Sequence, residues 1–245
     1  MKYRVKESFS KAVEEYDRYA VIQQQAGKRL LDRLRLIKWD GFILDLGAGT
    51  GVLLKGFKNT VALDLSLSMC RSCRNQELLP VSGDGEFLPF KSSVFDVVFS
   101  NFALQWMVPE RVASEVYRVL KSGGFAFVSL PVEGSLSRLL SAWNRAHIEV
   151  FGEEDVLFRF PSENRILEAF KEAGFKLLEF ERKEFSIWFD SPREAVRYVN
   201  RVGARNPFRK SKTNRELVKK FYEYYSLNGR FLLNYRVLFL VLKRI

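Results

Sequence analysis

Short apolar runs alternate with amphipathic segments along most of the chain, and each pattern predicts its own kind of element. Seven segments have the composition of β-strands: residues 42–46, 60–64, 79–83, 95–100, 125–130, 175–189 and 235–243. The segments between them have either the apolar spacing of helices or the composition of turns. Because parallel strands need long crossover connections, which helices usually provide, this alternation predicts an α/β fold. We expect a doubly wound, mostly parallel, seven-stranded sheet of the Rossmann-like type with a helical cap.

The first 36 residues have the apolar spacing of two consecutive helices, the second of them over 22–36. Such a segment can fold over a ligand pocket as a lid. It can equally be a packing helix whose Tyr16 and Tyr19 are half-buried, and the pattern leaves both interpretations open. Further helices are predicted at residues 112–120, 135–150, 164–173, 192–201 and 214–226.

A glycine-rich turn follows the first predicted strand. Three glycines with G-x-G-x-G spacing form it: Gly47, Gly49 and Gly51. Glycine permits positive φ and removes the Cβ atom, so a ligand can lie directly against backbone N–H groups. A helix beginning at about Val52 would point its N-terminus at the same ligand. An ordinary strand-to-helix turn explains the motif as well, and the motif alone does not decide between them.

Acidic residues lie at the ends of three successive strands: Asp45, Asp64 and Asp84. Ligands of open α/β sheets bind outside the carboxyl ends of the strands. Asp64 can accept hydrogen bonds from both hydroxyls of a ribose, or it can cap the helix that begins near Ser66. With the glycine turn beside it, we favour the ribose. Asp84 can accept from an adenine amino group, so the three acids together indicate a nucleoside ligand.

Charge is distributed very unevenly along the chain. The net charge is +11, and residues 190–245 hold 14 Lys/Arg against 4 Asp/Glu, a net of +10. The first 189 residues therefore carry only +1. Such a basic end is suited to nucleic acid, an acidic protein or an anionic lipid surface, or it is simply solvated.

Several classes of protein are not expected from the composition. No apolar run approaches the ~20 residues that span a bilayer, and the N-terminus has no apolar signal region. Cys70 and Cys73 form a lone C-x-x-C without a second ligand pair, so we expect no metal site. A single histidine, His147, on a mixed face is expected to be structural. The cysteine usage makes a cytoplasmic location the default expectation.

Several segments together resemble one family, the malonyl-[acyl-carrier protein] O-methyltransferases of biotin biosynthesis. The resemblance runs almost from end to end. It rests on FSKA and YD within 9–17, the DLGAGTG turn, ALDLS, GDGEFLP, SNFALQW, GSL at 134–136, IWFDSPREAVRYVNRVGA and YRVLFLVL. The D-x-G-x-G-x-G form of the turn is similar to the signature of class I methyltransferases that use S-adenosylmethionine. Ala48 stands where the family usually has cysteine, and Gly85 where a larger residue is common.

The resemblance implies S-adenosylmethionine as the methyl donor. The residues it assigns to cofactor binding are Gln23, Asp45, Gly47, Ala48, Gly49, Gly51, Asp64, Leu65, Met69, Asp84, Gly85, Glu86, Asn101 and Phe102. It also suggests a division of the chain into an N-terminal helical lid (1–40), a cofactor-binding core (41–131), a continuation with cap helices (132–234) and the final strand (235–245).

The implied reaction is methyl transfer to the free carboxylate of a malonyl thioester, which gives a methyl ester that can be elongated toward pimelate. A carboxylate is already ionised at pH 7, so no general base is needed. For orienting it we expect Arg197, with Tyr16 helping from the lid, although Arg197 can also be a surface position on a basic helix. Gln105 and Trp106 would flank the point of transfer.

The resemblance also implies an acyl carrier protein as partner, docked on the basic C-terminal helices by electrostatic attraction. A competing interpretation is a small-molecule, quinone-type C- or O-methyltransferase on the same core. An RNA methyltransferase or RNA-binding protein is a further alternative, but the chain has no RNA-module signature and we do not expect a nucleic-acid partner. A protein that binds the cofactor without turnover is also compatible with the motifs.

Overall fold

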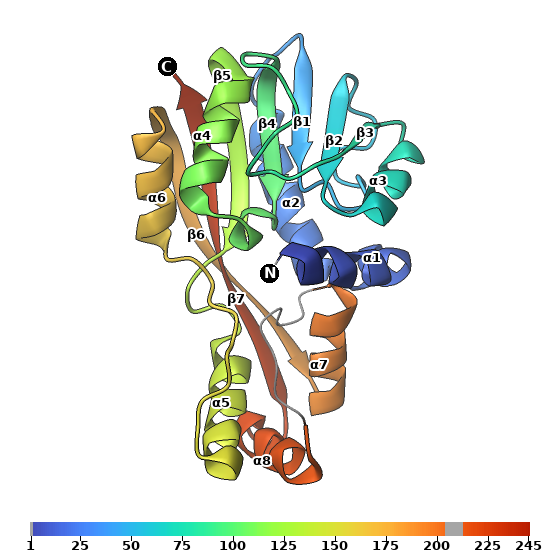
Figure 1. Cartoon of the computed structure of the whole chain (residues 1–245), viewed down its shortest axis with the longest axis vertical. Coiled ribbons are helices and arrows are strands. Elements are labelled where there is room, and N and C mark those ends of the chain that lie inside the picture. Colours follow the sequence, from blue (N-terminus) through green and yellow to red (C-terminus); the bar gives the residue numbers. More distant parts are fainter. Residues whose placement is uncertain (1, 204–212) are drawn as a thin grey trace.

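The computed structural model describes residues 2–203 and 213–245, which form one seven-stranded sheet with helices on both faces (Figure 1). The strands are β1 (Phe42–Leu46), β2 (Thr60–Asp64), β3 (Leu79–Ser82), β4 (Phe95–Asn101), β5 (Leu120–Pro131), β6 (Phe175–Phe189) and β7 (Phe231–Arg244). Their order across the sheet is β3-β2-β1-β4-β5-β7-β6. Strands β1 to β5 pair in parallel, and β7 is antiparallel to both β5 and β6. The predicted doubly wound, mostly parallel sheet is confirmed.

The sheet reverses its winding direction between β1 and β4. The chain moves from β1 outward through β2 to β3, and then returns to pair β4 with the other side of β1. Open sheets of this kind bind ligands in the crevice at such a switch point, outside the carboxyl ends of the strands. The glycine turn leaves β1 at this place.

The described residues contain eight α-helices and one short 3-10 helix. They are α1 (Lys2–Tyr19), α2 (Val21–Leu34), α3 (Leu67–Arg74), η1 (Leu104–Trp106), α4 (Pro109–Val119), α5 (Ser137–Phe151), α6 (Glu163–Glu172), α7 (Pro192–Arg201) and α8 (Arg215–Tyr225). All the predicted helices except one are present, with ends displaced by a few residues. No helix in residues 2–203 and 213–245 combines the length and apolar character needed to cross a membrane.

The helix expected to begin at about Val52 is absent, and that prediction was wrong. Residues 47–58 form only turns between β1 and β2. Four glycines in this short connection have positive φ: Gly47, Gly49, Gly51 and Gly56. A right-handed helix requires negative φ throughout, and the positive φ of Gly56, four residues after Val52, is incompatible with a helix that continues through this connection.

Alternate residues of the central strands point into two apolar layers, as expected for a sheet covered on both faces. Ile43 of β1 packs in the layer that contains Leu30 of α2. The next residue, Leu44, packs in the opposite layer with Val116 of α4 and Phe170 of α6. All five side chains are essentially inaccessible to solvent.

The last two strands extend well past the parallel part of the sheet. Their pairing runs from Phe175 opposite Arg244 to Phe189 opposite Phe231, and α5, α7 and α8 gather around the extended end (Figure 1). Strand β7 therefore begins at Phe231, four residues before the predicted Tyr235. Its early part alternates buried and partly exposed positions, which is typical of a half-buried strand rather than of a continuous apolar run.

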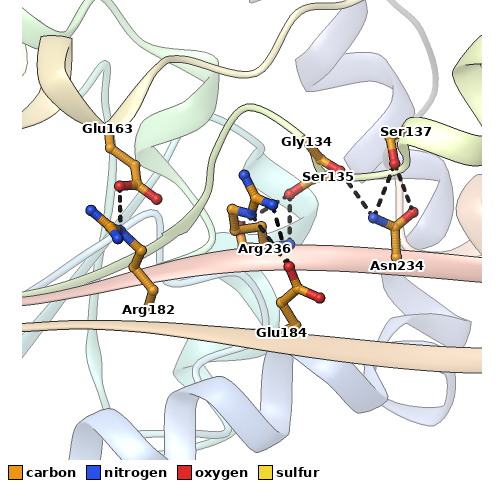
Figure 2. Close-up of polar contacts among 8 residues, drawn as sticks. All are labelled: Gly134, Ser135, Ser137, Glu163, Arg182, Glu184, Asn234 and Arg236. Atoms are coloured by element: carbon orange, nitrogen blue, oxygen red, sulfur yellow. Dashed lines mark hydrogen bonds and ion pairs between the residues drawn. The ribbon is translucent and has the colours of Figure 1, made fainter.

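The loop after β5 is fastened to β7 by hydrogen bonds (Figure 2). Asn234 Nδ2 donates to the carbonyl oxygen of Gly134 (2.9 Å) and to Oγ of Ser137 (3.2 Å). Ser135 Oγ donates to the carbonyl oxygen of Arg236 (3.1 Å), whose N–H donates back to the same Oγ (3.0 Å). These bonds fix the start of α5 against the sheet extension.

We expect Asn234→Ala to lower the free energy of unfolding by about 1–2 kcal/mol, because it leaves the Gly134 carbonyl and the Ser137 hydroxyl without their partner. Ser137→Ala removes only one of these contacts and serves as the matched control, with an expected loss of less than about 1 kcal/mol. Urea denaturation of the three proteins measures both values. An equal loss in the two variants would show that Asn234 does not hold this loop.

Candidate active site

The glycine turn approaches its neighbours too closely for any side chain. Gly47 has φ of +73°, and a Cβ atom there would lie 2.2 Å from Cβ of Ala103. Gly49 has φ of +57° and faces Tyr16 of α1. The N–H groups of Gly47 and Ala48 donate to the carbonyl oxygen of Leu63 (2.8 and 3.0 Å). The turn is therefore held against β2, with its open side toward the carboxyl edge of the sheet.

Asp64 holds two backbone segments at this edge. Its Oδ2 accepts from the N–H of Gly49 (3.0 Å), and its Oδ1 accepts from the N–H of Ser66 (2.8 Å). Burial raises the pKa of Asp64 to about 6, and hydrogen bonds from the backbone oppose that rise. The cap of α3 is Ser66, whose Oγ accepts from the N–H of Met69 (3.3 Å). Asp64 therefore supports the glycine turn while it lines the hollow beside it.

Asp45 is the most strongly perturbed carboxyl group at the edge. Its side chain is buried, and within the described residues no hydrogen bond or ion pair is made by its carboxyl group. Burial, and then the charge of Asp64, raise the pKa of Asp45 to about 8. The group lines a recess together with Gln23, Ala48 and Asn101. A positively charged ligand group placed in that recess would stabilise the Asp45 carboxylate.

The third acidic strand end is paired with the N-terminal helix. Lys2 Nζ lies 2.6 Å from Asp84 Oδ2 and 2.9 Å from Glu86 Oε1. Glu86 also accepts from the N–H of Val108 (3.0 Å) and pairs with Arg111. The buried Glu86 therefore ties three segments together, whereas Asp84 remains at the hollow's surface.

Helix α1 lies across the carboxyl edge and is attached there at three points. Besides the Lys2 pairs, Ser10 Oγ is 2.8 Å from Ser66 Oγ, and Thr50 Oγ1 donates to Asp17 Oδ1 (2.6 Å). These contacts join the helix to β3's acidic end, to the cap of α3 and to the glycine turn. As a result, Phe9 and Tyr16 face inward over the hollow.

The hollow under α1 has about 740 Å³ of empty space, part of which is open to solvent. Most of the predicted cofactor residues line it or the adjoining recess: Gln23, Asp45, Gly47, Ala48, Gly49, Asp64, Leu65, Asp84, Gly85, Asn101 and Phe102. The structure thus brings together residues from α2 and from the ends of β1, β2, β3 and β4. Helix α1 closes it from above.

A second chamber of about 700 Å³ adjoins the first hollow. The two share Phe9, Tyr16, Phe102 and Trp106. The remaining walls are apolar or neutral: Gln23, Gln105, Pro131, Leu136, Leu139, Leu140, Phe158, Phe160, Val199, Val202 and Tyr235. Among the described lining residues, none carries a formal charge.

Several buried polar atoms in this chamber have no hydrogen-bond partner within the described part of the chain. They are Gln23 Oε1, Gln105 Oε1, Trp106 Nε1 and Tyr235 OH. Buried polar groups are normally satisfied, so four orphans in one chamber indicate a polar ligand group. Burial raises the pKa of Tyr235 far above its usual value, which keeps its hydroxyl protonated as a donor. Burial and the nearby carboxylates of Asp64 and Asp17 likewise raise the pKa of Tyr16.

A strained turn places the aromatic residues between the two hollows. Phe102 has φ of +55°, and its N–H donates to the carbonyl oxygen of Ser129 (2.8 Å). Gln105 Nε2 donates to the carbonyl oxygen of Phe102 (2.7 Å), which fixes η1 behind the turn. Trp106 is then held between Phe9 and Phe158, with ring centroids 6.0 and 4.5 Å away. Left-handed backbone in a bulky residue is costly and is concentrated at functional sites.

Four of the predicted site residues line neither hollow nor the recess. Gly51 is buried, and a Cβ atom there would lie 2.7 Å from Leu78. A glycine is therefore needed at this position for the turn to pack against its neighbours. Met69 is buried in α3, and Glu86 holds the three segments described above. Arg197 lies on the exposed side of α7 and makes no ion pair or hydrogen bond with another described residue. This placement does not support Arg197 as the ligand of a carboxylate in the chamber.

The sequence prediction missed Tyr235, Phe9 and Lys2 as site residues. Tyr235 lies within YRVLFLVL, and only the folded structure shows that it lines the acceptor chamber. Lys2 reaches Asp84 over 82 residues of sequence, a contact for which no local pattern exists.

The remaining candidates for chemistry are structural. Cys70 and Cys73 are buried free thiols, and Cys73 Sγ donates to the carbonyl oxygen of Gly49 (3.2 Å). His147 lies on α5, outside both hollows. Its side chain is buried, and its Nδ1 lies 2.8 Å from the carbonyl oxygen of Glu153. Over the ranges that the structure describes, no cluster of three or more His, Cys, Asp or Glu residues could hold a metal ion.

Comparison with known proteins agrees with this geometry. A family described as "Methyltransferase domain" matches residues 44–128, which contain the glycine turn and all three acidic strand ends. A solved structure from Bacillus halodurans, assigned as a methyltransferase, superposes with a TM-score of 0.63 at 20% identity, covering 88% of this chain and 98% of that one. A sequence identity of 20% supports a shared fold and does not by itself indicate a shared function.

Two curated relatives show the family. A malonyl-[acyl-carrier protein] O-methyltransferase from a Marinomonas species is 34% identical over 83% of this chain and 77% of its own length. The protein of the same description from Herminiimonas arsenicoxydans is 33% identical over 97% of this chain and 94% of its own length. Similarity at this level over nearly the whole of both chains shows that this protein belongs to the malonyl-[acyl-carrier protein] O-methyltransferase family.

Proposed function

We propose that this protein transfers a methyl group from S-adenosylmethionine to the free carboxylate of a malonyl group carried by an acyl carrier protein. The observation that carries the proposal is the pair of hollows joined at Tyr16, Phe102 and Trp106. One has the acidic, glycine-lined wall of a nucleoside site, and the other is apolar and uncharged with unpartnered polar atoms. The methyl ester so formed would prime pimelate and biotin synthesis.

The cofactor site fits the donor in its charge and shape. Asp64 offers carboxylate oxygens to ribose hydroxyls, and Gly49 leaves room for a ligand against the turn. Asp45 in the recess is suited to an ammonium group. S-adenosylmethionine supplies an electrophilic methyl group when bound. Asp45, Asp64 and the glycine turn would hold it, and Tyr16 and Trp106 would line the same hollow.

The acceptor chamber is suited to a nucleophile that is already charged. A malonyl carboxylate is ionised at pH 7 and needs no general base. Trp106 Nε1, Tyr235 OH and Tyr16 OH can donate hydrogen bonds to it without adding a counter-charge. A strong ion pair would stabilise the carboxylate before transfer more than during it, and would thereby slow the reaction. Neutral donors in an apolar chamber orient the oxygen and exclude water.

The proposed partner is the acyl carrier protein itself, attracted by the basic C-terminal helices. Helices α7 and α8 belong to the segment 190–245, which has a net charge of +10. Electrostatic attraction of this kind raises association rates with acidic partners and weakens with added salt. A cytoplasmic location accords with this partner.

Methyl transfer can be tested directly with the purified protein and S-adenosylmethionine labelled in its methyl group. Malonyl-loaded carrier protein should acquire label in a base-labile ester, whereas acetyl-loaded carrier, which lacks the free carboxylate, should not. Label that instead enters a quinone or another small-molecule acceptor, with none in malonyl-carrier, would contradict the proposal and favour the small-molecule methyltransferase.

Tyr235→Phe should lower kcat/KM for malonyl-carrier by about 10- to 100-fold, because a hydrogen bond to a charged group contributes about 1.5–3 kcal/mol. The dissociation constant for S-adenosylmethionine should change by less than about twofold, since Tyr235 lines only the acceptor chamber. Tyr225→Phe is the matched control, because that buried hydroxyl donates to the carbonyl oxygen of Leu232 (2.9 Å) away from the site. Equal activity in the two variants would remove Tyr235 from the mechanism.

Asp45→Asn should abolish a pH dependence of cofactor binding. In the empty protein the pKa of Asp45 is about 8, so a cationic ligand must displace a proton below that pH. The affinity of the native protein should therefore rise from pH 6 to pH 8, by at most about tenfold per unit, and level off above. The Asn variant should bind more weakly and with little change over this range, as measured by titration calorimetry. An affinity of the native protein that is independent of pH would contradict an ionising Asp45 at the ligand.

The same raised pKa has the opposite effect on stability without ligand. The folded state binds a proton that the unfolded chain, with an ordinary Asp pKa near 4, has already lost. Stability should therefore fall as pH rises from about 4 to 8, and Asp45→Asn should gain stability relative to the native protein over that window. Thermal unfolding at pH 5 and pH 8.5 measures the difference.

A further inference from the structure

A third hollow begins where the acceptor chamber ends. Helices α5, α7 and α8 form its walls around the extended end of β6 and β7 (Figure 1). It shares Leu139, Leu140 and Val199 with the acceptor chamber. Its other described lining residues are mainly apolar, with the amide of Asn200 and the hydroxyl of Thr213 among them. The three hollows therefore form a series from the glycine turn to the far end of the molecule.

The arrangement of the three hollows provides two separate routes into the acceptor chamber. The cofactor hollow contacts the acceptor chamber at Phe9, Tyr16 and Trp106, on the side of α1. The α5–α7–α8 groove contacts the same chamber at different residues, the three named above. A donor and an acceptor that occupy different routes can meet in the chamber without passing each other.

Arginines flank the groove along helical stripes. On α7, Val196 and Asn200 line the groove, and Arg193 and Arg197 lie three residues before each of them. On α8, Arg215 lies three residues before the lining residue Val218. Residues three apart share a face of a helix, so these cations lie beside the groove. All three are exposed, and none forms an ion pair or hydrogen bond with another described residue.

We infer that the groove between α5, α7 and α8 is the passage for the acyl-bearing phosphopantetheine arm of the carrier protein, with Arg193, Arg197 and Arg215 as contacts for its phosphate and for acidic carrier residues. This inference rests on the proposed function. A pantetheine arm is a flexible, uncharged chain with two amide groups, which suits an apolar passage with an occasional amide or hydroxyl. Its outer end carries a phosphate and an acidic protein, which suit unpaired arginines. Arg197 thus acquires a role outside the chamber.

Charge reversal tests the outer contacts on folded protein. Arg193→Glu, Arg197→Glu and Arg215→Glu should each raise KM for malonyl-carrier by about tenfold or more at low salt, with kcat changed by less than about twofold. The effect should diminish as salt is added. Malonyl-N-acetylcysteamine has the thioester but no phosphate or carrier, so its turnover should fall by less than about twofold. Arg74→Glu on α3 is the matched control, since Arg74 is also exposed and lies on a helix that does not line the groove.

Three results would overturn the inference. One is an equal rise in KM for Arg74→Glu, which would show only a general charge effect. Another is an unchanged KM for carrier in all three groove variants. The third is a loss of kcat with both substrates in Arg197→Glu, which would show that Arg197 acts on the malonyl group in the acceptor chamber.

A plug at the junction tests the passage itself. Val199→Trp should lower kcat/KM for malonyl-carrier by about tenfold or more, while the dissociation constant for S-adenosylmethionine stays within about twofold. Leu178→Trp, at an exposed position of β6 outside the three hollows, is the size-matched control and should retain turnover. Full carrier turnover in Val199→Trp would contradict the passage. If the native protein itself transfers no methyl group to malonyl-carrier, the proposed function fails, and that result is distinct from failure of the passage alone.

Discussion

The attachment of α1 across the carboxyl edge of the sheet is the interaction on which both hollows depend. Lys2, Ser10 and Asp17 contact the acidic end of β3, the cap of α3 and the glycine turn. Without these contacts Phe9 and Tyr16 would not close the cofactor hollow, and the wall they share with the acceptor chamber would be lost. Each contact consists of one or two hydrogen bonds or ion pairs of modest strength, so α1 can be held in place and still be released. That balance accords with a lid that must admit the donor.

Charge is separated in this molecule according to the role of each surface. Asp64 and Asp84 line the cofactor hollow together with Lys2 and Lys6, arginines flank the far groove, and the described walls of the chamber between them carry no charged group. A cationic donor, an anionic nucleophile and an anionic carrier thus each have a suitable environment. The uncharged chamber follows from the chemistry that we propose, because a carboxylate nucleophile loses reactivity when it is strongly paired.

The parallel core was predictable because its signals are local. The apolar strands, the acidic strand ends and the glycines each lie within a few consecutive residues, and the predicted cofactor residues Asp45, Asp64 and Asn101 meet as expected. The acceptor chamber could not be predicted from the sequence. Its walls come from α2, η1, α5, α7 and β7, and only tertiary packing brings these elements together. Arg197 shows the difference: its charge was visible in the sequence, but the face of α7 that carries it was not. The prediction of a helix after Val52 was wrong for a local reason, because the positive φ of Gly56 does not allow a helix to continue through that connection.

The dependence of kcat on pH, measured with saturating S-adenosylmethionine and malonyl-carrier, tests the central claim most directly. If the substrate's own carboxylate is the nucleophile and neutral donors orient it, kcat should be constant from about pH 6 to pH 9, because no group of the protein must gain or lose a proton. A rise of kcat with an apparent pKa near 7, or a bell-shaped profile, would show that a side chain acts as a base, and would contradict this account.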